Sequence, residues 1–239
     1  MAERQGGAAP PQPPRSSRGP VSPYTVFLGL AFIALVALAG INALRTREGG
    51  TLGVGVSGKG EPLAEFAVAD ARGELSGDAN VAQDDCNSSA RPCPASDRRT
   101  PACRVDEAGA IRVCDLFDKP LVLSFWFTRG GDCEAEQDVF EAAYRRYRSR
   151  VNFLAIDVRD PRNTVTKLID ERGWTHQIGL DTDGALSNLY RIGGCPSFIY
   201  VYPGGIVQDT SIGELSTSEL GAKIDMLQKA SAERAAANR

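Results

Sequence analysis

Residues 121–133, with the sequence LVLSFWFTRGGDC, decide the fold of this chain. They begin as an apolar run rich in β-branched and aromatic residues, which is typical of a buried strand. The run breaks at Gly130-Gly131, and residues 134–147 then carry apolar side chains at helical spacing. Cys133 therefore lies where a strand turns into a helix. Unpaired N–H groups and the positive end of the helix dipole favour a thiolate there, so Cys133 is the first candidate for a reactive side chain.

Composition limits the classes of protein to consider. The chain has 239 residues, enough for one ordinary domain with appendages, and its formal net charge of -3 gives no indication of a nucleic-acid partner. It has one histidine, and the clustered cysteines contain no C-x-x-C pair, so we expect no metal site and no cofactor. Disulfides explain the cysteines better and require an oxidising compartment. The four clustered cysteines are Cys86, Cys93, Cys103 and Cys114.

The N-terminal part of the chain predicts a membrane attachment. Residues 1–23 are rich in Pro, Gly, Ser and Arg and are expected to be a disordered tail. Residues 24–44 hold no charge and are long enough for the roughly 20 residues of a helix that crosses a bilayer. The alternative is a cleaved signal peptide, because Ala37-Leu38-Ala39 resembles a cleavage site. Either interpretation exports the domain, and the long tail before the segment and the length of the apolar run favour the uncleaved anchor. We therefore expect a single-pass protein of a bacterial cell membrane with its C-terminal domain outside the cytoplasm.

Three further segments complete the predicted organisation. Residues 45–61 are a Gly-rich linker, residues 62–230 form the folded domain, and residues 231–239 are expected to fray. Residues 76–118 have little periodicity and contain the clustered cysteines, which suggests an insertion stapled by disulfides. Four cysteines permit three pairings, and the sequence does not choose among them. A structural role is favoured for these bridges, because closing loops restricts the unfolded chain.

The order of elements predicts an α/β domain with a mixed sheet covered by helices. Asp160 and Pro161 are expected to start a helix that ends at Gly173, as an N-cap and a first-turn proline. Ser216 and Glu219 have the spacing of a capping box for a last helix that ends near residue 230. No strand is expected in residues 174–180, which are short and mixed. The predicted strands are residues 66–68, 121–126, 151–157, 197–202 and 206–212, with a short helix at residues 185–190.

This order of elements, with its motifs, resembles the thioredoxin fold over residues 62–230. The nearest resemblance is to membrane-anchored thiol–disulfide oxidoreductases of the TlpA/ResA type and the related redoxins. Their motif is W-C-x-x-C, whereas here Gly130 takes the place of the attacking cysteine and only Cys133 remains. The buried acid that some thioredoxins carry before the motif is also replaced, by Ser124. The motifs that carry the resemblance are Ser124-Phe125-Trp126, Asp181-Thr182-Asp183-Gly184-Ala185, Gly194-Cys195-Pro196-Ser197-Phe198 and Pro203-Gly204-Gly205.

The resemblance implies a partner for Cys133. In the family, a proline before a strand forms a cis peptide bond that faces the active-site turn, and Pro196 matches this proline. By the family's geometry the preceding residue, Cys195, lies beside Cys133, so we expect a disulfide between them or a thiol pair that forms one. The family also implies that Pro196, Arg129 and Gly130 contact the substrate. Protein thiols or disulfides, or a membrane electron donor, are the implied partners.

Three roles for this cysteine pair remain open. In the first, Cys133 and Cys195 form a redox-active dithiol, in which the Cys133 thiolate attacks and Cys195 resolves the mixed disulfide. In the second, Cys133 reduces peroxides as in peroxiredoxins, with Arg129 lowering its pKa, although Gly130 replaces the threonine of their T-x-x-C pattern. In the third, the disulfide is static and the domain is a binding or structural module. The only histidine, His176, is expected to be a surface or loop residue rather than a catalytic base.

Overall fold

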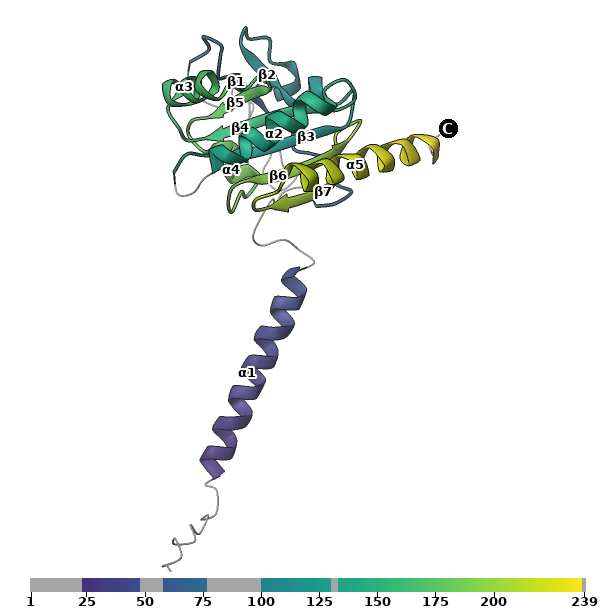
Figure 1. Cartoon of the computed structure of the whole chain (residues 1–239). Helices are drawn as coiled ribbons and strands as arrows, with labels where there is room; N and C mark the ends of the chain where they lie inside the picture. Colours follow the sequence, from purple (N-terminus) through teal and green to yellow (C-terminus); the bar gives the residue numbers. More distant parts are fainter. Residues whose placement is uncertain (1–22, 48–57, 77–99, 130–132, 238–239) are drawn as a thin grey trace, which may run out of the picture. The chain divides into compact units, whose positions relative to one another are not determined.

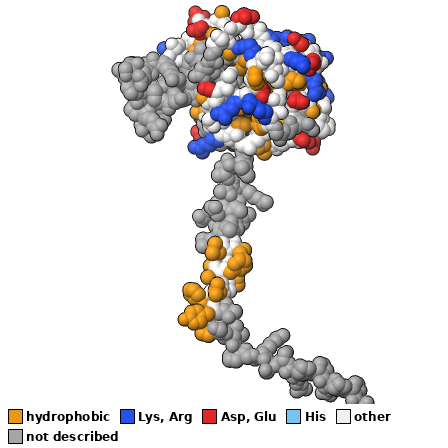
Figure 2. All heavy atoms as spheres, turned by 90° about the vertical axis from the view of Figure 1, so that its left-hand side faces the viewer, with side chains coloured by type: hydrophobic (Ala, Val, Ile, Leu, Met, Phe, Trp, Pro, Cys, Tyr) orange, Lys and Arg blue, Asp and Glu red, His pale blue; other side chains and the backbone are white. Residues whose placement is uncertain are grey.

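The computed structural model describes residues 23–47, 58–76, 100–129 and 133–237. The chain divides into two compact units, Met1–Thr46 and Arg47–Arg239. Helix α1 (Pro23–Arg47) has 25 residues, and the side chains described between Tyr24 and Val36 include many exposed apolar ones (Figure 2). Within the described residues, no helix combines the length and the apolar character needed to cross a bilayer. The predicted membrane crossing of residues 24–44 therefore stays a prediction.

A mixed seven-stranded sheet forms the centre of the second unit, in the order β2-β1-β5-β4-β3-β6-β7 (Figure 1). The neighbours β3–β4 and β4–β5 are parallel, and the other pairs are antiparallel. This confirms the predicted mixed sheet of a thioredoxin-like α/β fold. The strands are β1 (Ala67–Asp70), β2 (Ala110–Arg112), β3 (Leu121–Trp126), β4 (Asn152–Val158), β5 (Gln177–Asp181), β6 (Ser197–Tyr202) and β7 (Ile206–Ile212).

Helices cover both faces of this sheet. Helices α2 (Cys133–Tyr147), α3 (Arg162–Arg172) and α5 (Thr217–Ala237) pack their buried residues into one core cluster. Helix α4 (Ala185–Leu189) contributes to the cluster on the opposite face. Strand β3 is buried at every position, because its side chains alternate between the two clusters, and this explains why it appears as a continuous apolar run.

Two predictions about the middle of the domain were wrong. Strand β5 begins at Gln177 within residues 174–180, lies between β1 and β4 and has Gly179 at its centre. A Cβ atom there would come within 2.5 Å of a Val68 side-chain carbon, so the close packing of β1 and β5 requires a glycine. Because glycine is unfavourable in strands, this residue made the segment look unlike a strand in the sequence. Asp160 is not the cap of α3, because Pro161 is the N-cap residue and has no side-chain cap bond. The predicted end of α3 at Gly173 is confirmed, with φ at 66°.

The two ends of the domain also differ from expectation. Residues 231–237 do not fray but continue α5 to Ala237, in keeping with their alanine-rich sequence, and Arg234 lies over the Tyr202 ring at 5.2 Å. The predicted insertion at residues 76–118 includes β2, an edge strand paired with β1, so its end belongs to the sheet. Residues 77–99 of that segment lie outside the described residues. The capping box is confirmed, because the Ser216 N–H donates to Glu219 Oε2 at 2.8 Å and the Glu219 N–H donates to Ser216 Oγ at 3.2 Å.

Candidate functional site

The structure joins Cys133 and Cys195 in a disulfide although they are 62 residues apart in sequence. Their Cα atoms are 5.9 Å apart, within the range that a disulfide can bridge. The peptide bond between Cys195 and Pro196 is cis. Both features agree with what the resemblance implied. The structure therefore brings together the two sulfurs on which all three candidate roles depend.

The two cysteines differ in exposure. Cys133 is the first residue of α2, and only 5% of its surface is exposed. Its Sγ therefore lies at the positive end of a 15-residue helix, where a thiolate is stabilised. Cys195 is half-buried and precedes β6. Of the two residues, Cys195 is the more exposed.

Asp160, in the loop between β4 and α3, binds Thr128 and Arg129, which follow β3. Its buried carboxylate accepts the Thr128 N–H at 2.6 Å, the Thr128 hydroxyl at 2.8 Å and Arg129 Nε at 3.4 Å. Arg129 also donates to the carbonyl oxygen of Arg159. The guanidinium is thus directed toward Asp160 and Arg159, which weakens the case for Arg129 as the cation of a peroxidatic cysteine. Gly130 lies outside the described residues.

Buried acids surround the Cys133 end of the sheet. Glu136, one helical turn after Cys133, is buried and accepts the Leu215 N–H at 3.2 Å, and burial raises its pKa. Asp157, at the end of β4, is fully buried, and its Oδ1 accepts the Asp160 N–H at 3.2 Å. Burial, together with the charge of Asp160, raises the pKa of Asp157 to about 9. Asp157 is therefore a neutral carboxylic acid at neutral pH.

Three buried polar atoms near these acids have no hydrogen-bond partner in the part of the chain that the structure describes. They are Trp126 Nε1, Gln137 Oε1 and Asp157 Oδ2. The Gln137 amide donates to Ser124 Oγ at 3.2 Å, so a neutral pair occupies the place of the buried acid of other thioredoxins. Sequence reasoning did not select Asp157, although the alternation of strand residues 153, 155 and 157 places it on the same face as the core residues of β4.

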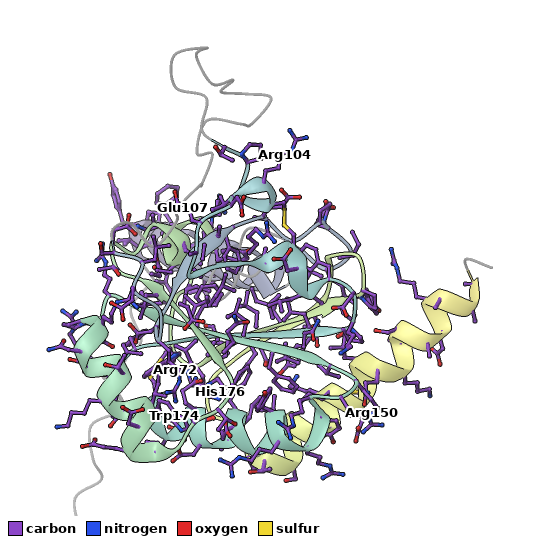
Figure 3. All side chains as sticks on the ribbon, turned by 90° about the horizontal axis from the view of Figure 1, so that it is seen from above. Arg72, Arg104, Glu107, Arg150, Trp174 and His176 are labelled. Carbon is purple, nitrogen blue, oxygen red and sulfur yellow. A yellow bond between two sulfur atoms is a disulfide. The ribbon has the colours of Figure 1, made fainter. Side chains whose placement is uncertain are left out.

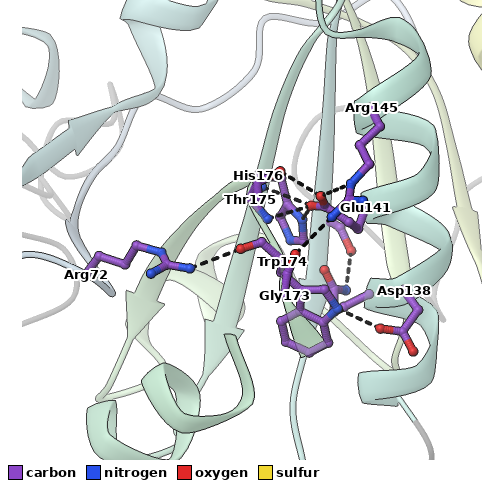
Figure 4. Close-up of polar contacts among 10 residues, drawn as sticks. Arg72, Asp138, Glu141, Arg145, Gly173, Trp174, Thr175 and His176 are labelled. Atoms are coloured by element: carbon purple, nitrogen blue, oxygen red, sulfur yellow. Dashed lines mark hydrogen bonds and ion pairs between the residues drawn. The ribbon is translucent and has the colours of Figure 1, made fainter. Parts of the chain in front are cut away.

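The prediction for His176 was wrong. Its side chain is fully buried, and Nδ1 lies 2.8 Å from Oε2 of Glu141, a residue of α2 (Figure 4). The sequence could not indicate this pairing, because Glu141 precedes His176 by 35 residues and belongs to another element. The four arginines near the end of α2, at positions 145, 146, 148 and 150, are exposed as a solvated helix end would be.

A second disulfide joins Cys103 to Cys114, whose Cα atoms are 5.7 Å apart. It links two short 3-10 helices, η2 (Ala102–Arg104) and η3 (Val113–Leu116), on either side of β2. Glu65 lies close enough for its carboxylate oxygen and the two sulfurs to be within 4.8 Å of one another. Because both sulfurs are bonded to each other, they are not available as thiolate ligands. Cys86 and Cys93 lie outside the described residues.

The fold and the cysteine geometry define a class of protein. A mixed sheet, a cysteine at the start of the helix after the central strand, and a cis proline beside that cysteine are the features of a thioredoxin-like domain. The family profile described as the AhpC/TSA family matches residues 95–210. The resemblance to thioredoxin-like thiol–disulfide oxidoreductases and redoxins is thus confirmed.

Individual relatives agree with this class. The thiol-disulfide oxidoreductase ResA of Oceanobacillus iheyensis is 28% identical over 117 residues, which cover 48% of this chain and 60% of that protein. The thiol:disulfide interchange protein TxlA of Synechococcus elongatus is 28% identical over 125 residues, covering 52% of this chain and 55% of that protein. The matched part of this chain therefore spans less than two thirds of either relative.

Solved structures show the same fold. A putative thiol:disulfide interchange protein DsbE from Chlorobium tepidum superposes with a TM-score of 0.53 at 14% identity, covering 72% of this chain and 99% of that one. A putative protein disulfide isomerase from Bacteroides thetaiotaomicron gives a TM-score of 0.52 at 16% identity, covering 73% and 92%. At this level of identity the likeness supports the fold and not the activity.

Proposed function

We propose that this protein is a thiol–disulfide oxidoreductase whose redox centre is the Cys133–Cys195 disulfide. The observation that carries the proposal is the placement of this bond. One sulfur lies at a helix N-terminus, and the other is half-buried beside a cis proline. A thiolate at the helix end is a good leaving group, and Cys195 is the more exposed of the two residues, so we assign Cys195 as the site of attack and Cys133 as the leaving group.

The burial of the two cysteines favours one order of events. A substrate thiolate attacks Cys195 Sγ, the bond between the two cysteines breaks, and its electron pair leaves on Cys133 as a thiolate. The second substrate thiolate then attacks the substrate sulfur of the mixed disulfide, and Cys195 leaves and takes up a proton. The substrate dithiol is oxidised to a disulfide and the protein pair is reduced to two thiols. In the reverse direction Cys195 attacks and Cys133 resolves, the opposite of the roles expected from the sequence.

Neighbouring groups support this chemistry. Glu136 is a buried acid within one helical turn of Cys133, and burial raises its pKa, so we propose it as the group that exchanges a proton with the Cys133 thiol. Pro196 is buried, and its carbonyl oxygen accepts the Gly213 N–H at 2.9 Å, so it contributes shape rather than a free acceptor. Arg129, Gly130 and Pro196 remain our proposed contacts for a partner chain.

We also propose that residues 24–44 anchor the protein in the cell membrane of a bacterium, with residues 62–230 as the redox domain outside the cytoplasm. Support comes from the absence of charge in residues 24–44 and from the exposed apolar side chains of α1 (Figure 2). The disulfides support an oxidising compartment. The partners would be protein thiols and disulfides, or a membrane electron donor.

The test is catalysed reduction of insulin by dithiothreitol, with the other disulfide as the internal control. Cys133→Ser and Cys195→Ser should each lower the rate at least about a hundredfold, since exchange needs both sulfurs. The double variant Cys103→Ala with Cys114→Ala should stay within about twofold of the parent protein, because that pair lies in short turns without a helix N-terminus. Equal rates in all variants, or no activity in the parent protein, would leave a static disulfide as the better description.

A further inference from the structure

The two edge strands of the sheet differ in length. Strand β2 has three residues, and a very short edge strand offers little to a pairing chain. Figure 3 shows Arg104 and Glu107, which lead into β2, on the side of the domain away from Trp174 and His176. Strand β7 has seven residues and is the outermost strand at the opposite edge (Figure 1). It is therefore the edge along which another chain can pair.

The first half of the outer side of β7 is already paired with an extended segment of this chain. The Val207 N–H donates to the Glu61 carbonyl oxygen at 2.9 Å, and the Gly60 N–H donates to the Val207 carbonyl oxygen at 2.8 Å. Pro62 forms an antiparallel bridge with Ile206. The outer side of β7 is thus able to take up a strand, and among the described residues this pairing stops at Val207.

The second half of the outer side of β7 presents backbone groups to its surroundings. Residues of an antiparallel strand alternate between facing the partner strand and facing away from it. The Gly213 N–H donates to the Pro196 carbonyl oxygen at 2.9 Å, so Gly213 faces β6. The alternation then directs the N–H and C=O groups of Thr210 and Ile212 away from β6. Within residues 58–76, 100–129 and 133–237, these four groups have no backbone hydrogen-bond partner.

This part of the edge adjoins the redox pair. Ile212 is the register partner of Ser197, which follows Cys195 by two positions. A Cβ atom on Gly194 would lie 3.1 Å from Ile212 Cδ1, so the Ile212 side chain reaches the loop that carries Cys195. Ile212 is 45% exposed. An exposed apolar side chain and unpaired backbone groups therefore meet beside Cys195.

Thiol exchange itself brings a partner chain to this place. In the mixed disulfide, the partner's cysteine is bonded to Cys195, so the residues that flank it lie close by. A strand added outside β7 would lie two strand spacings of about 4.8 Å from β6, the strand that Cys195 precedes, and an extended residue spans about 3.3 Å. A segment about three to five residues away from the partner's cysteine can therefore reach this edge.

We propose that the partner chain adds to β7 as a further strand at Thr210 and Ile212, about three to five residues from the cysteine that bonds to Cys195. Backbone hydrogen bonds give the affinity, and Ile212 selects an apolar side chain in the added strand. The inference rests on the proposed redox function, because it describes the partner of the same site. The exchange step is unchanged: the partner thiolate attacks Cys195, and the electron pair of the broken bond leaves on Cys133.

The test measures the rate of mixed-disulfide formation between the full chain and cysteine peptides, by thiol trapping and mass-spectrometric mapping. In the first peptide, a spacer of three glycines joins the cysteine to the segment Thr-Val-Thr-Val. The second peptide is identical except for N-methyl groups on alternate backbone nitrogens of that segment, which block strand pairing. The first peptide should react at least about tenfold faster, because up to four backbone hydrogen bonds form at about 1 kcal/mol each. Equal rates overturn the proposal.

A pair of variants tests the side chain. Ile212→Lys should reduce the preference for the unmethylated peptide at least about fivefold, because an apolar contact is lost and a lysine blunts the edge. Met226→Lys is the matched control, since Met226 is the other exposed large apolar side chain that the structure describes outside α1, and it lies on α5. It adds the same charge and should keep the preference. Equal effects of the two variants overturn the assignment of Ile212.

The length of the spacer tests the geometry. A single glycine spans only about 3.3 Å, so the preference for the unmethylated peptide should disappear with this spacer. A preference that is independent of the spacer overturns the proposal. So does self-association of the parent protein that Ile212→Lys abolishes, because a second copy would then be the occupant of the edge.

The outcome separates this inference from the function on which it rests. Insulin reduction together with equal rates for the two peptides keeps the redox function and overturns the added strand. Absence of insulin reduction and of exchange with either peptide overturns both.

Discussion

The Cys133–Cys195 and Cys103–Cys114 disulfides hold together different kinds of structure in the same domain. The first joins the start of a 15-residue helix to a loop 62 residues further along the chain. The second joins two short 3-10 helices that flank an edge strand, and its cysteines are 11 residues apart. Both pairs have similar Cα separations, 5.9 and 5.7 Å, so the backbone distance does not distinguish them. What distinguishes them is the surroundings of the sulfur atoms.

This difference shows how position in the fold determines the chemistry of a bond. The positive end of the α2 dipole stabilises a thiolate at Cys133, and the buried acid Glu136 lies one helical turn away. Cys103 and Cys114 are both half-buried, and neither lies on a helix longer than about one turn. We therefore expect the first pair to exchange and the second to hold the edge of the sheet.

The largest expected effect is on the unfolding free energy, to which the Cys133–Cys195 disulfide should contribute more than Cys103–Cys114. Chain-entropy arithmetic for the two loop lengths gives roughly 4 kcal/mol for Cys133–Cys195 and roughly 3 kcal/mol for Cys103–Cys114. The two double cysteine-to-alanine variants should lose these amounts of unfolding free energy in urea titrations under oxidising conditions. A larger loss from the shorter loop would show that local packing, and not ring size, governs the second bridge.

The next effect is on reduction potential. We expect the two potentials to differ by at least about 60 mV, a hundredfold difference in equilibrium constant, with Cys133–Cys195 the more oxidising pair. Cys103–Cys114 should lie below about −300 mV, as structural disulfides do. Glutathione titration with thiol trapping and mass-spectrometric mapping measures both in one sample. Coincident potentials would remove the distinction between the two bonds.

The third prediction concerns pH, and it involves only the Cys133 end of the sheet. Because the folded pKa of Asp157 is raised from 3.8 to about 9, the folded state binds more protons than the unfolded state in this range. The contribution of Asp157 to the unfolding free energy is fully present below pH 3.8. It is lost as the pH rises toward about 9, at up to about 1.4 kcal/mol per pH unit.

Asp157→Asn should therefore flatten the fall in unfolding free energy between about pH 5 and pH 8, measured by urea titration, by up to about 1.4 kcal/mol per pH unit. Asp115→Asn is the matched control, because Asp115 is exposed and next to Cys114. An unchanged slope in Asp157→Asn would mean that Asp157 is ionised in the folded protein.

The smallest effect is that of a single hydrogen bond in the turn. Thr128→Val removes the hydroxyl that donates to Asp160 at 2.8 Å and should lower the unfolding free energy by about 1 kcal/mol. It should change the rate of thiol exchange at Cys133–Cys195 and leave Cys103–Cys114 unaffected. Thr166→Val, which removes a hydroxyl bonded within α3, is the control. A change in the exchange rate at both disulfides would contradict a local role for this bond.

Much of the fold could be predicted, because its signals are local. Strand β3 and helix α2 are apparent from the change of apolar period around Gly130-Gly131, and the turn chemistry indicated the β6–β7 hairpin. The pairing of Cys133 with Cys195 was available only through the resemblance, since nothing local connects residues that are 62 positions apart.

The rest depends on interactions between distant segments. Strand β5 begins with a polar residue and contains Gly179. A glycine is needed there because the Val68 side chain on the neighbouring strand leaves no room for a Cβ atom. Asp160 resembles a helix cap, but its carboxylate is used by Thr128, 32 residues earlier. His176 is buried because Glu141 on α2 compensates its polarity. Each error arose where a partner from elsewhere in the chain determined the state of a residue.

The long separation between Cys133 and Cys195 means that the oxidised chain contains a covalent ring. That ring encloses α2, β4, α3, β5 and α4, which include two of the three parallel strands. One protease cut within it would leave two fragments linked through sulfur, and dithiothreitol would release them. In the proposed exchange, a substrate that donates electrons opens the ring, and the reduced domain should become the easier form to unfold or digest.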